Sequence, residues 1–270
     1  MFIFVNVIHE TGETGGRRAR IRAERSDEIV AAAWEIVRAE GIGALTTHAL
    51  AARLDLAVGA LYRYFPSKAA IVAELERRAL VALGDALTGA LARADGAFRG
   101  PGAPLARLCL LALAYGRFAR ERSSEFALLG QMLADPRVLV PAEAAAAPTE
   151  ATLAILELAA RAFAEAAEAG ALSPGDAVER ATLYGAGLRG ALELTKLRTH
   201  AAEVDGGALA DAMARALLAG FGADPEALAR AFAAARRPPR RPATPSRASP
   251  ARGSPRGRAR CRRRGPTRGR

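Results

Sequence analysis

The chain has 270 residues, of which 51% are hydrophobic and 5% aromatic, and its formal net charge at pH 7 is +11. This length exceeds the roughly 50 residues of a three-helix domain, so a second, larger domain is expected. Alanine and leucine are abundant, which favours helices over strands. No apolar run reaches the roughly 18 residues of a membrane span, and MFIFVNVI lacks the basic start of a secretory signal.

The positive charge is concentrated near the carboxyl end. Fourteen arginines and no acidic residue lie in residues 236–270, so the first 235 residues carry a net charge of −3. Within them, residues 17–68 carry +3 and residues 69–235 carry −4. A basic amino-terminal region followed by an acidic body is typical of a DNA-binding protein with a separate control domain.

Residues that support catalysis or metal binding are sparse. The three histidines, His9, His48 and His200, are far apart, and Cys109 and Cys261 lack neighbours at metal-ligand spacing. The chain has no glycine-rich phosphate loop and no nucleophile elbow. We therefore expect neither an enzyme nor a cofactor, and two isolated cysteines fit a reducing cytoplasm.

The first predicted helix begins near Ser26 and ends at Gly41. Ser26 precedes two acidic residues, a cap followed by first-turn acids, and apolar residues then recur at helical spacing. Five arginines lie just before it, between Arg17 and Arg25. They suggest a flexible basic arm over residues 1–21 that follows the DNA backbone or enters the minor groove.

Residues 46–65, TTHALAARLDLAVGALYRYF, predict two short helices joined by a turn. Thr46 or Thr47 can cap the first helix, and the second is expected to run from Val58 to Phe65 until Pro66 ends it. In a helix-turn-helix motif, the first helix braces the second, and the second helix enters the major groove of DNA. This pattern predicts such a motif.

The second helix carries side chains suited to DNA. Small residues let the backbone approach a phosphate, tyrosine hydroxyls and a lysine can bind phosphate oxygens, and an arginine can bind guanine through O6 and N7. These residues are Gly59, Ala60, Tyr62, Arg63, Tyr64 and Lys68. The alternative is that the tyrosines belong to the core and that the charged residues only form a solvent-exposed face of the helix.

The segment IVAAAWEIVRAEGIGALTTHALAARLDLAVGALYRYFPSKAAIVAEL resembles the amino-terminal domain of TetR-type (TetR/AcrR) transcriptional regulators, over roughly residues 22–78. The resemblance implies an all-α fold, with a three-helix DNA-binding head over residues 22–82 and a larger effector-binding and dimerisation domain over residues 83–235. It also implies contacts with double-stranded DNA from Thr47, His48, Val58, Gly59, Ala60, Tyr62, Arg63, Tyr64 and Lys68.

Two residues of the turn depart from the family's pattern. The family usually has a glycine followed two residues later by a serine or threonine that caps the recognition helix, whereas this chain has Asp55 and Ala57. Replacing a capping hydroxyl by alanine costs roughly 1 kcal/mol. Asp55 also adds a negative charge near the DNA, so we expect modest DNA affinity.

The rest of the chain predicts further helices. They are expected near residues 68–94, 105–120, 124–133, 149–169, 176–199, 207–220 and 225–235. Three prolines, of which Pro148 is the last, are expected to break the chain before the helix over 149–169.

Residues 183–194, LYGAGLRGALEL, resemble the W-x-x-x-x-H-G region of some family members, with Tyr184 and Arg189 in place of the Trp and His. In the family the last two long helices form a four-helix dimer interface, and Gly187 and Gly190 here allow close helix approach. The alternative is that these small residues serve helix packing within one subunit rather than a dimer interface. A palindromic operator requires two-fold symmetry, so we expect a homodimer.

The resemblance also implies a pocket for a small hydrophobic effector in the helical body. Aromatic and sulfur side chains with a few polar groups suit such a ligand, although each is also a plausible core residue. The candidates are Tyr115, Phe118, Phe126, Leu129, Gln131, Met132, Phe163 and Tyr184. The effector would favour a conformation whose recognition helices no longer fit successive major grooves, so the chain would be a ligand-released repressor.

Residues 236–270 consist largely of Arg, Pro, Ser and Gly and are expected to be disordered. Their arginines can add salt-sensitive, sequence-independent affinity for DNA or RNA, or they have no defined role. A nonspecific nucleic-acid-binding protein driven by this tail is therefore the alternative function. Both functions place the chain in the cytoplasm, at the nucleoid.

Overall fold

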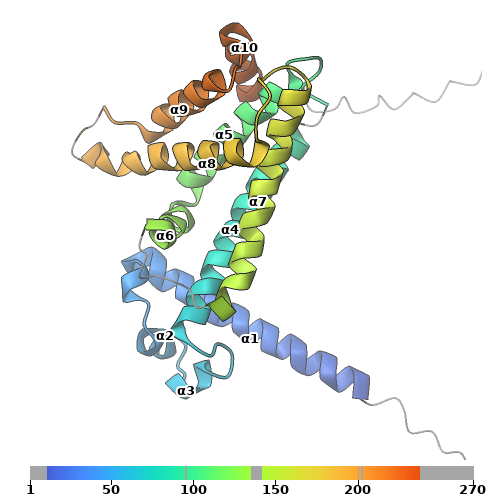
Figure 1. Ribbon diagram of the computed structural model, residues 1–270. Helices are drawn as coiled ribbons and strands as arrows, with labels where there is room; N and C mark the ends of the chain where they lie inside the picture. The colour runs from blue at the N-terminus through green and yellow to red at the C-terminus, as the bar shows by residue number, and fades with distance from the viewer. Residues whose placement is uncertain (1–10, 95, 135–141, 200, 202, 238–270) are drawn as a thin grey trace, which may run out of the picture. The chain divides into compact units, whose positions relative to one another are not determined.

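Helices make up all the regular structure that the computed structural model contains in its described part (Figure 1). The described residues are 11–94, 96–134, 142–199, 201 and 203–237, and side chains are not described at 11–15, 132–134, 142–143 and 199. No β-strand occurs among these residues. The expected all-α fold is thereby confirmed.

The amino-terminal head is built from α1 (Thr11–Glu40), the short η1 (Ile42–Ala44), α2 (Thr47–Arg53) and α3 (Val58–Leu61). Its core is apolar, because the helices bury one face each. The fully or almost fully buried residues include Ile29, Val30, Ala33, Leu45, Leu50 and Leu61. The three-helix head expected from the sequence is present.

The first helix starts much earlier than its sequence suggests. It begins at Thr11, and the Ser26 hydroxyl donates a hydrogen bond to the Arg22 carbonyl, 3.0 Å away, inside the helix. The expected start at Ser26 is therefore wrong, and residues 11–21 are helical rather than a flexible arm. No glycine or proline occurs between residues 17 and 40, and the arginines and alanines there favour helix, so nothing ends the helix at the cap signal.

The long helix α4 (Lys68–Arg93) belongs to both the head and the body. The Ser67 hydroxyl caps it by accepting a hydrogen bond from the Ala70 amide at 3.1 Å. At its start α4 packs against α1, and farther along it runs beside α7 (Ala142–Glu168) (Figure 1). The expected boundary between residues 82 and 83 therefore falls within one continuous helix.

The body is completed by helices that closely follow the expected ranges. They are α5 (Ala103–Glu121), α6 (Ser123–Ala134), α8 (Ala177–Glu193), η2 (Leu194–Thr199), α9 (Gly206–Gly220) and α10 (Pro225–Arg236). The side chains of Asp176, Asp205 and Asp224 cap α8, α9 and α10 by accepting hydrogen bonds from backbone amides. The buried residues of head and body form one core cluster.

Pro148 does not interrupt the chain as expected. It lies inside α7, which begins at Ala142. A proline removes one backbone hydrogen bond of a helix, and packing of α7 along α4 offsets that loss. The described residues all belong to one compact unit, and residues 240–270 lie outside the described part.

Candidate nucleic-acid interface

The bracing helix α2 is fixed by a cap and a buried face. Thr46, rather than Thr47, is the cap, since its hydroxyl accepts a hydrogen bond from the Ala49 amide at 3.0 Å. Leu50 and Ala51 are 0% and 2% exposed, so this face of α2 packs into the head. Thr47 is therefore the first residue of the helix and is half-buried.

The turn between α2 and α3 requires a left-handed residue. Asp55 has φ of 53°, and the Leu56 amide bonds back to the Ala51 carbonyl at 2.9 Å. This arrangement is a helix-ending turn that glycine adopts at the lowest cost and aspartate or asparagine at a moderate one. The geometry explains the glycine in the family's pattern and shows that Asp55 is accommodated.

The recognition helix is shorter than expected. It spans only Val58–Leu61, and single-turn hydrogen bonds continue through Tyr64, whose amide bonds to the Leu61 carbonyl at 2.9 Å. The expected helix over 58–65 is thus wrong in its second half. Ala57 stands at its amino-terminal end and provides no side-chain cap, so α3 lacks one stabilising hydrogen bond that a serine or threonine can supply.

The predicted DNA contacts fall into an exposed group and a partly packed group. His48, Gly59, Tyr62, Arg63 and Lys68 are exposed, and a side chain at Gly59 would project into open space. Thr47, Val58, Ala60 and Tyr64 are half-buried, and two of these, a valine and a tyrosine, pack against the core. Three of the exposed residues, Gly59, Tyr62 and Arg63, lie in residues 58–64, which we call the recognition segment, whereas His48 lies on α2 and Lys68 begins α4.

Tyr64 has a partner that the sequence did not indicate. The guanidinium of Arg22, on α1, lies 5.8 Å from the centre of the Tyr64 ring. A second link joins α1 to α2, where Arg53 Nη2 and Glu35 Oε2 are 2.7 Å apart. Neither pair has a sequence signal, because their members are 42 and 18 residues apart.

The residues suggested for an effector pocket form two separate clusters. In one, Phe163 packs edge-to-face on Tyr184 and Phe221 at 5.4 and 5.8 Å, and the Tyr184 hydroxyl donates to the Leu108 carbonyl at 3.2 Å. Burial raises the pKa of Tyr184 well above its usual value, so the hydroxyl stays protonated. This cluster is tightly packed core.

The second cluster surrounds Arg189, whose side chain is 12% exposed. Its guanidinium lies 4.9 Å from the Phe126 ring centre and donates hydrogen bonds to the Phe126 carbonyl at 3.1 Å and the Tyr115 hydroxyl at 3.3 Å. Burial raises the pKa of Tyr115. Of the other candidates, Phe118 and Leu129 are buried, Gln131 is exposed, and the Met132 side chain lies outside the described residues.

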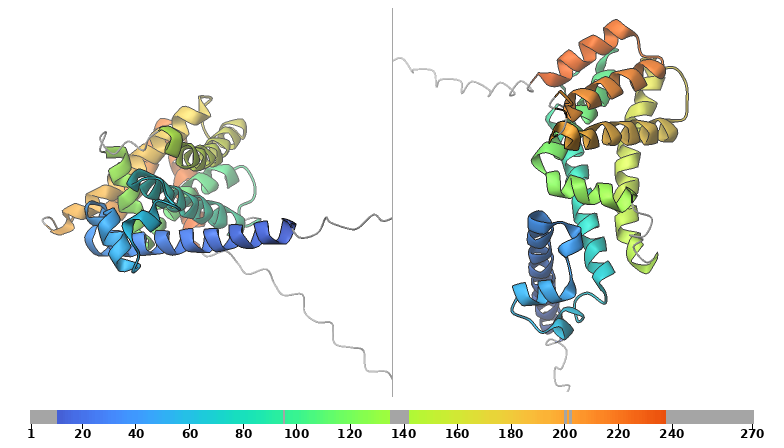
Figure 2. Two further views of the ribbon diagram at one scale, coloured as in Figure 1. Left: turned by 90° about the horizontal axis from the view of Figure 1, so that it is seen from below. Right: turned by 90° about the vertical axis from the view of Figure 1, so that its left-hand side faces the viewer.

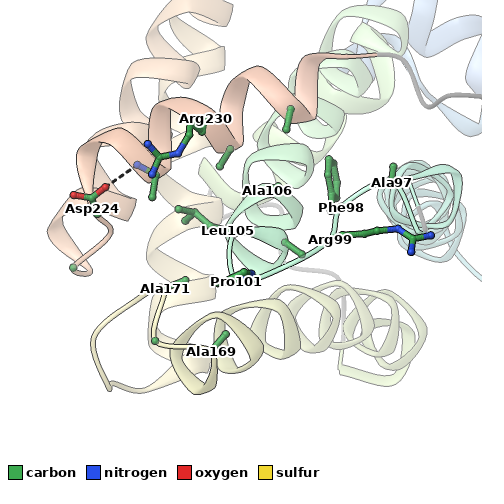
Figure 3. A pocket seen from close by; sticks show the side chains of 17 residues that line it. Ala97, Phe98, Arg99, Pro101, Leu105, Ala106, Ala169, Ala171, Asp224 and Arg230 are labelled. Carbon is green, nitrogen blue, oxygen red and sulfur yellow. Dashed lines mark hydrogen bonds between the residues drawn. The ribbon is translucent and has the colours of Figure 1, made fainter.

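A cavity of ≈ 560 Å³ that could hold a small molecule lies elsewhere in the helical body (Figure 3). Its walls come from the α4–α5 loop, α5, the end of α7 and α10, and they include Phe98, Arg99, Leu105, Ala227 and Arg230. None of the eight predicted pocket residues lines it. A smaller cavity of ≈ 200 Å³ between α4 and α5 includes Phe118.

An apolar surface covers one side of α8, η2 and α9. Its large side chains are Leu183 (48% exposed), Leu194 (43%), Leu197 (46%), Leu209 (39%) and Met213 (38%), and we call it the α8–α9 face. Gly190 lies among them with open space around it, whereas Gly187 lies against α9, where a side chain would meet Leu217 and Met213. Gly187 therefore serves packing within the subunit, and Gly190 lies on the surface.

Within the described part of the chain, no group of His, Cys, Asp and Glu is arranged to hold a metal ion. No described helix is long and apolar enough to cross a membrane.

A bracing helix, a tight turn and an exposed recognition segment on a three-helix head define a helix-turn-helix DNA-binding protein. Residues 29–75 match the model of a protein family described as bacterial regulatory proteins of the tetR family. The amino-terminal domain therefore belongs to the TetR family. Proteins of the family are DNA-binding transcription factors rather than enzymes.

Solved structures share the fold over most of the chain. A tetR-family regulatory protein from Rhodococcus RHA1 is 22% identical, with a TM-score of 0.54 over 74% of this chain and 97% of its own. SmeT, the repressor of the Stenotrophomonas maltophilia multidrug efflux pump SmeDEF, is 18% identical, with a TM-score of 0.53 and coverages of 73% and 89%. RolR in complex with resorcinol is 17% identical, with a TM-score of 0.54 and coverages of 82% and 97%. No curated protein sequence matches the chain.

Proposed function

We propose that this protein is a transcriptional repressor that binds a palindromic DNA operator as a homodimer and releases it when a small apolar effector binds. The recognition segment carries this proposal: Tyr62 and Arg63 are exposed while Leu61 beside them is 1% exposed and anchors the segment. A helix held in this way can present base-reading side chains to a major groove. Binding to the chromosome would place the protein at the nucleoid.

The test of DNA recognition is selection of bound duplexes from a random-sequence pool by the full chain. We expect a single palindromic sequence to be enriched. Arg63→Ala should then weaken binding to that duplex by roughly 5- to 150-fold, as loss of a bidentate guanine contact does. Arg161→Ala, at a 73% exposed position on α7, is the matched control and should bind like the unaltered chain. Enrichment of no sequence, or an equal loss in both variants, contradicts the proposal.

The α8–α9 face supports the homodimer. Leu183, Gly190, Leu194 and Leu197 recur at spacings of seven, four and three residues, so they share one side of the helical path. Exposed contiguous apolar surface of this kind marks an interaction site, and an identical face on a second copy would bury it. Two copies would also present two recognition segments to the two halves of a palindrome.

The ≈ 560 Å³ cavity supports an effector site in the body, because it has the volume of a small-molecule pocket. The sequence-based candidates around Phe163 and Arg189 are tightly packed, so we place the effector in this cavity instead. RolR binds resorcinol, which makes small phenols the first probes for this chain.

Two α10 alanines provide a matched test of that site. Ala227 lines the cavity, whereas Ala229 is exposed and does not. If a phenol in a panel that begins with resorcinol releases the selected duplex, Ala227→Trp should abolish that release and Ala229→Trp should preserve it. Release that survives Ala227→Trp would place the effector elsewhere, and a panel without effect would argue against phenolic effectors.

A further inference from the structure

The amino-terminal half of α1 is a basic helix that extends beyond the rest of the head (Figures 1 and 2). Among its arginines, Arg17, Arg18, Arg20 and Arg22 are exposed, and Arg25 is half-buried. Five cations within nine residues give this segment a high density of positive charge. Such a density requires an anionic partner or solvent.

The arginines are divided between the faces of the helix. Arg18, Arg22 and Arg25 are four and three residues apart and therefore share one face, whereas Arg20 lies opposite. Ile29 continues the same face four residues later and is fully buried in the head. The three arginines, which we call the arginine face, thus lie on the side of α1 that faces the head.

Tyr64 shows which part of the head this face adjoins. The Arg22 guanidinium lies 5.8 Å from the centre of the Tyr64 ring, and Tyr64 follows directly after the exposed Tyr62 and Arg63 of the recognition segment. The arginine face is therefore continuous with the surface that presents the recognition segment.

The base of the extension is held in place by α4. Arg78 on α4 forms ion pairs with Asp27 on α1 and, at 2.8 Å, with Glu74 on its own helix. Burial raises the pKa of Glu74, but hydrogen bonds from Arg77 and Arg78 outweigh this effect and leave it below its usual value. The carboxylate therefore stays ionised and keeps Arg78 positioned to hold α1.

The charges of the extension are available to a partner. Arg17, Arg18 and Arg20 form no ion pair with another described side chain, and the contact shown for Arg22 is the aromatic one with Tyr64. Among the five arginines, Arg25 alone is paired with a described acidic side chain, that of Glu28.

We propose that the arginine face of α1 binds phosphates of duplex DNA beside the half-site contacted by the recognition segment, and that it does so as a rigid helix. The proposal rests on the DNA-binding function. Arg18 and Arg22 are about 6 Å apart along the helix axis, close to the width of the minor groove, so they can reach phosphates on its two sides. Duplex DNA is the occupant because it is anionic and already lies against the adjoining recognition segment.

The test compares two double variants of the full chain that lose the same charge from the same helix. Binding to the duplex selected by the unaltered chain is measured over a series of salt concentrations. In R18A/R22A, the slope of log affinity against log salt should fall by about 1.8 for each bound protomer, since each lost phosphate contact removes about 0.9. In R17A/R20A, on the other faces, the slope should change by less than half of that amount.

A third variant, R18K/R22K, keeps the charge and should retain most of the slope. Equal losses in R18A/R22A and R17A/R20A would show a flexible arm and overturn the rigid-helix proposal. An unchanged slope in R18A/R22A would show that the arginine face does not bind DNA. Failure of the proposed function itself looks different, because then the unaltered chain selects no duplex at all.

Discussion

Asp55 combines two local effects, since it is the only non-glycine residue with a positive φ in the described part of the chain and it adds a negative charge beside the recognition segment. Left-handed backbone is unfavourable for residues with a Cβ atom. We predict that Asp55→Gly increases the free energy of unfolding in urea by roughly 0.5–1 kcal/mol. It should also raise DNA affinity.

Asp55→Asn separates the two effects, because asparagine removes the charge and tolerates the left-handed backbone about as well as aspartate. It should raise DNA affinity with little change in stability. A glycine variant that unfolds at lower urea concentration than the unaltered chain would contradict the conformational explanation.

Cys109 is fully buried, and burial raises the pKa of its thiol from 9.0 to about 12. In the unfolded chain the thiol ionises near pH 9, so the unfolded state loses its proton first and stability falls as the pH rises from 9 towards 12. Between pH 8 and pH 10 this effect amounts to about 1.4 kcal/mol. In a Cys261→Ser background, Cys109→Ala should reduce the measured pH dependence of urea unfolding by that amount. Identical pH dependence in both proteins would refute it.

At the scale of elements, the α8–α9 face predicts how the dimer can be broken. Gly190 has no atom near the position of a side chain, so Gly190→Arg should leave the fold of one subunit intact. On the dimer face it would place two charges in an apolar interface, which is unfavourable. We predict a monomer by sedimentation and weak binding to the selected palindrome.

Leu153→Arg is the control, because Leu153 is 57% exposed on α7, outside the α8–α9 face. It should remain dimeric and bind DNA normally. A dimeric Gly190→Arg variant, by contrast, would show that this face is not the interface.

The helices also show which local signals predict structure reliably. Thr46 caps the helix that its sequence position indicates, and Ser67 and Asp176 cap theirs in the same way, because a cap bonds to amides two or three residues away. Ser26 and Pro148, by contrast, gave wrong predictions of where a helix begins. In each case the neighbouring residues favour helix, and packing along α4 also supports α7, so one local signal is overridden.

At the scale of the whole molecule, α6 joins the head to the body through Glu125. This carboxylate is 7% exposed and its Oε1 lies 3.1 Å from Arg38 Nη2 on α1 and 3.6 Å from Arg122 Nη1. Glu125→Gln would remove the charge that both arginines face. Because Arg38 is 52% exposed and water can solvate it, the unpaired arginine costs less than a buried one would. We predict that the free energy of unfolding in urea falls by roughly 1–2 kcal/mol.

The neighbouring Glu121→Gln is the control, since Glu121 is exposed and has no ion pair to a described residue. It should unfold within about 0.5 kcal/mol of the unaltered chain, as surface substitutions usually do. Equal unfolding free energies in both variants would show that the Arg38–Glu125 pair does not stabilise the link between head and body.

The sequence by itself determined the helical class, the position of the two-helix motif between Thr46 and Phe65, and most helix ranges, because these depend on periodicity and capping among neighbouring residues. Only the tertiary structure decided which residues meet across the chain. It placed Arg22 over Tyr64, packed Phe163 against Tyr184 and Phe221, and formed the ≈ 560 Å³ cavity from residues that no local pattern connects. Such contacts join segments far apart in sequence, and they depend on how whole helices pack.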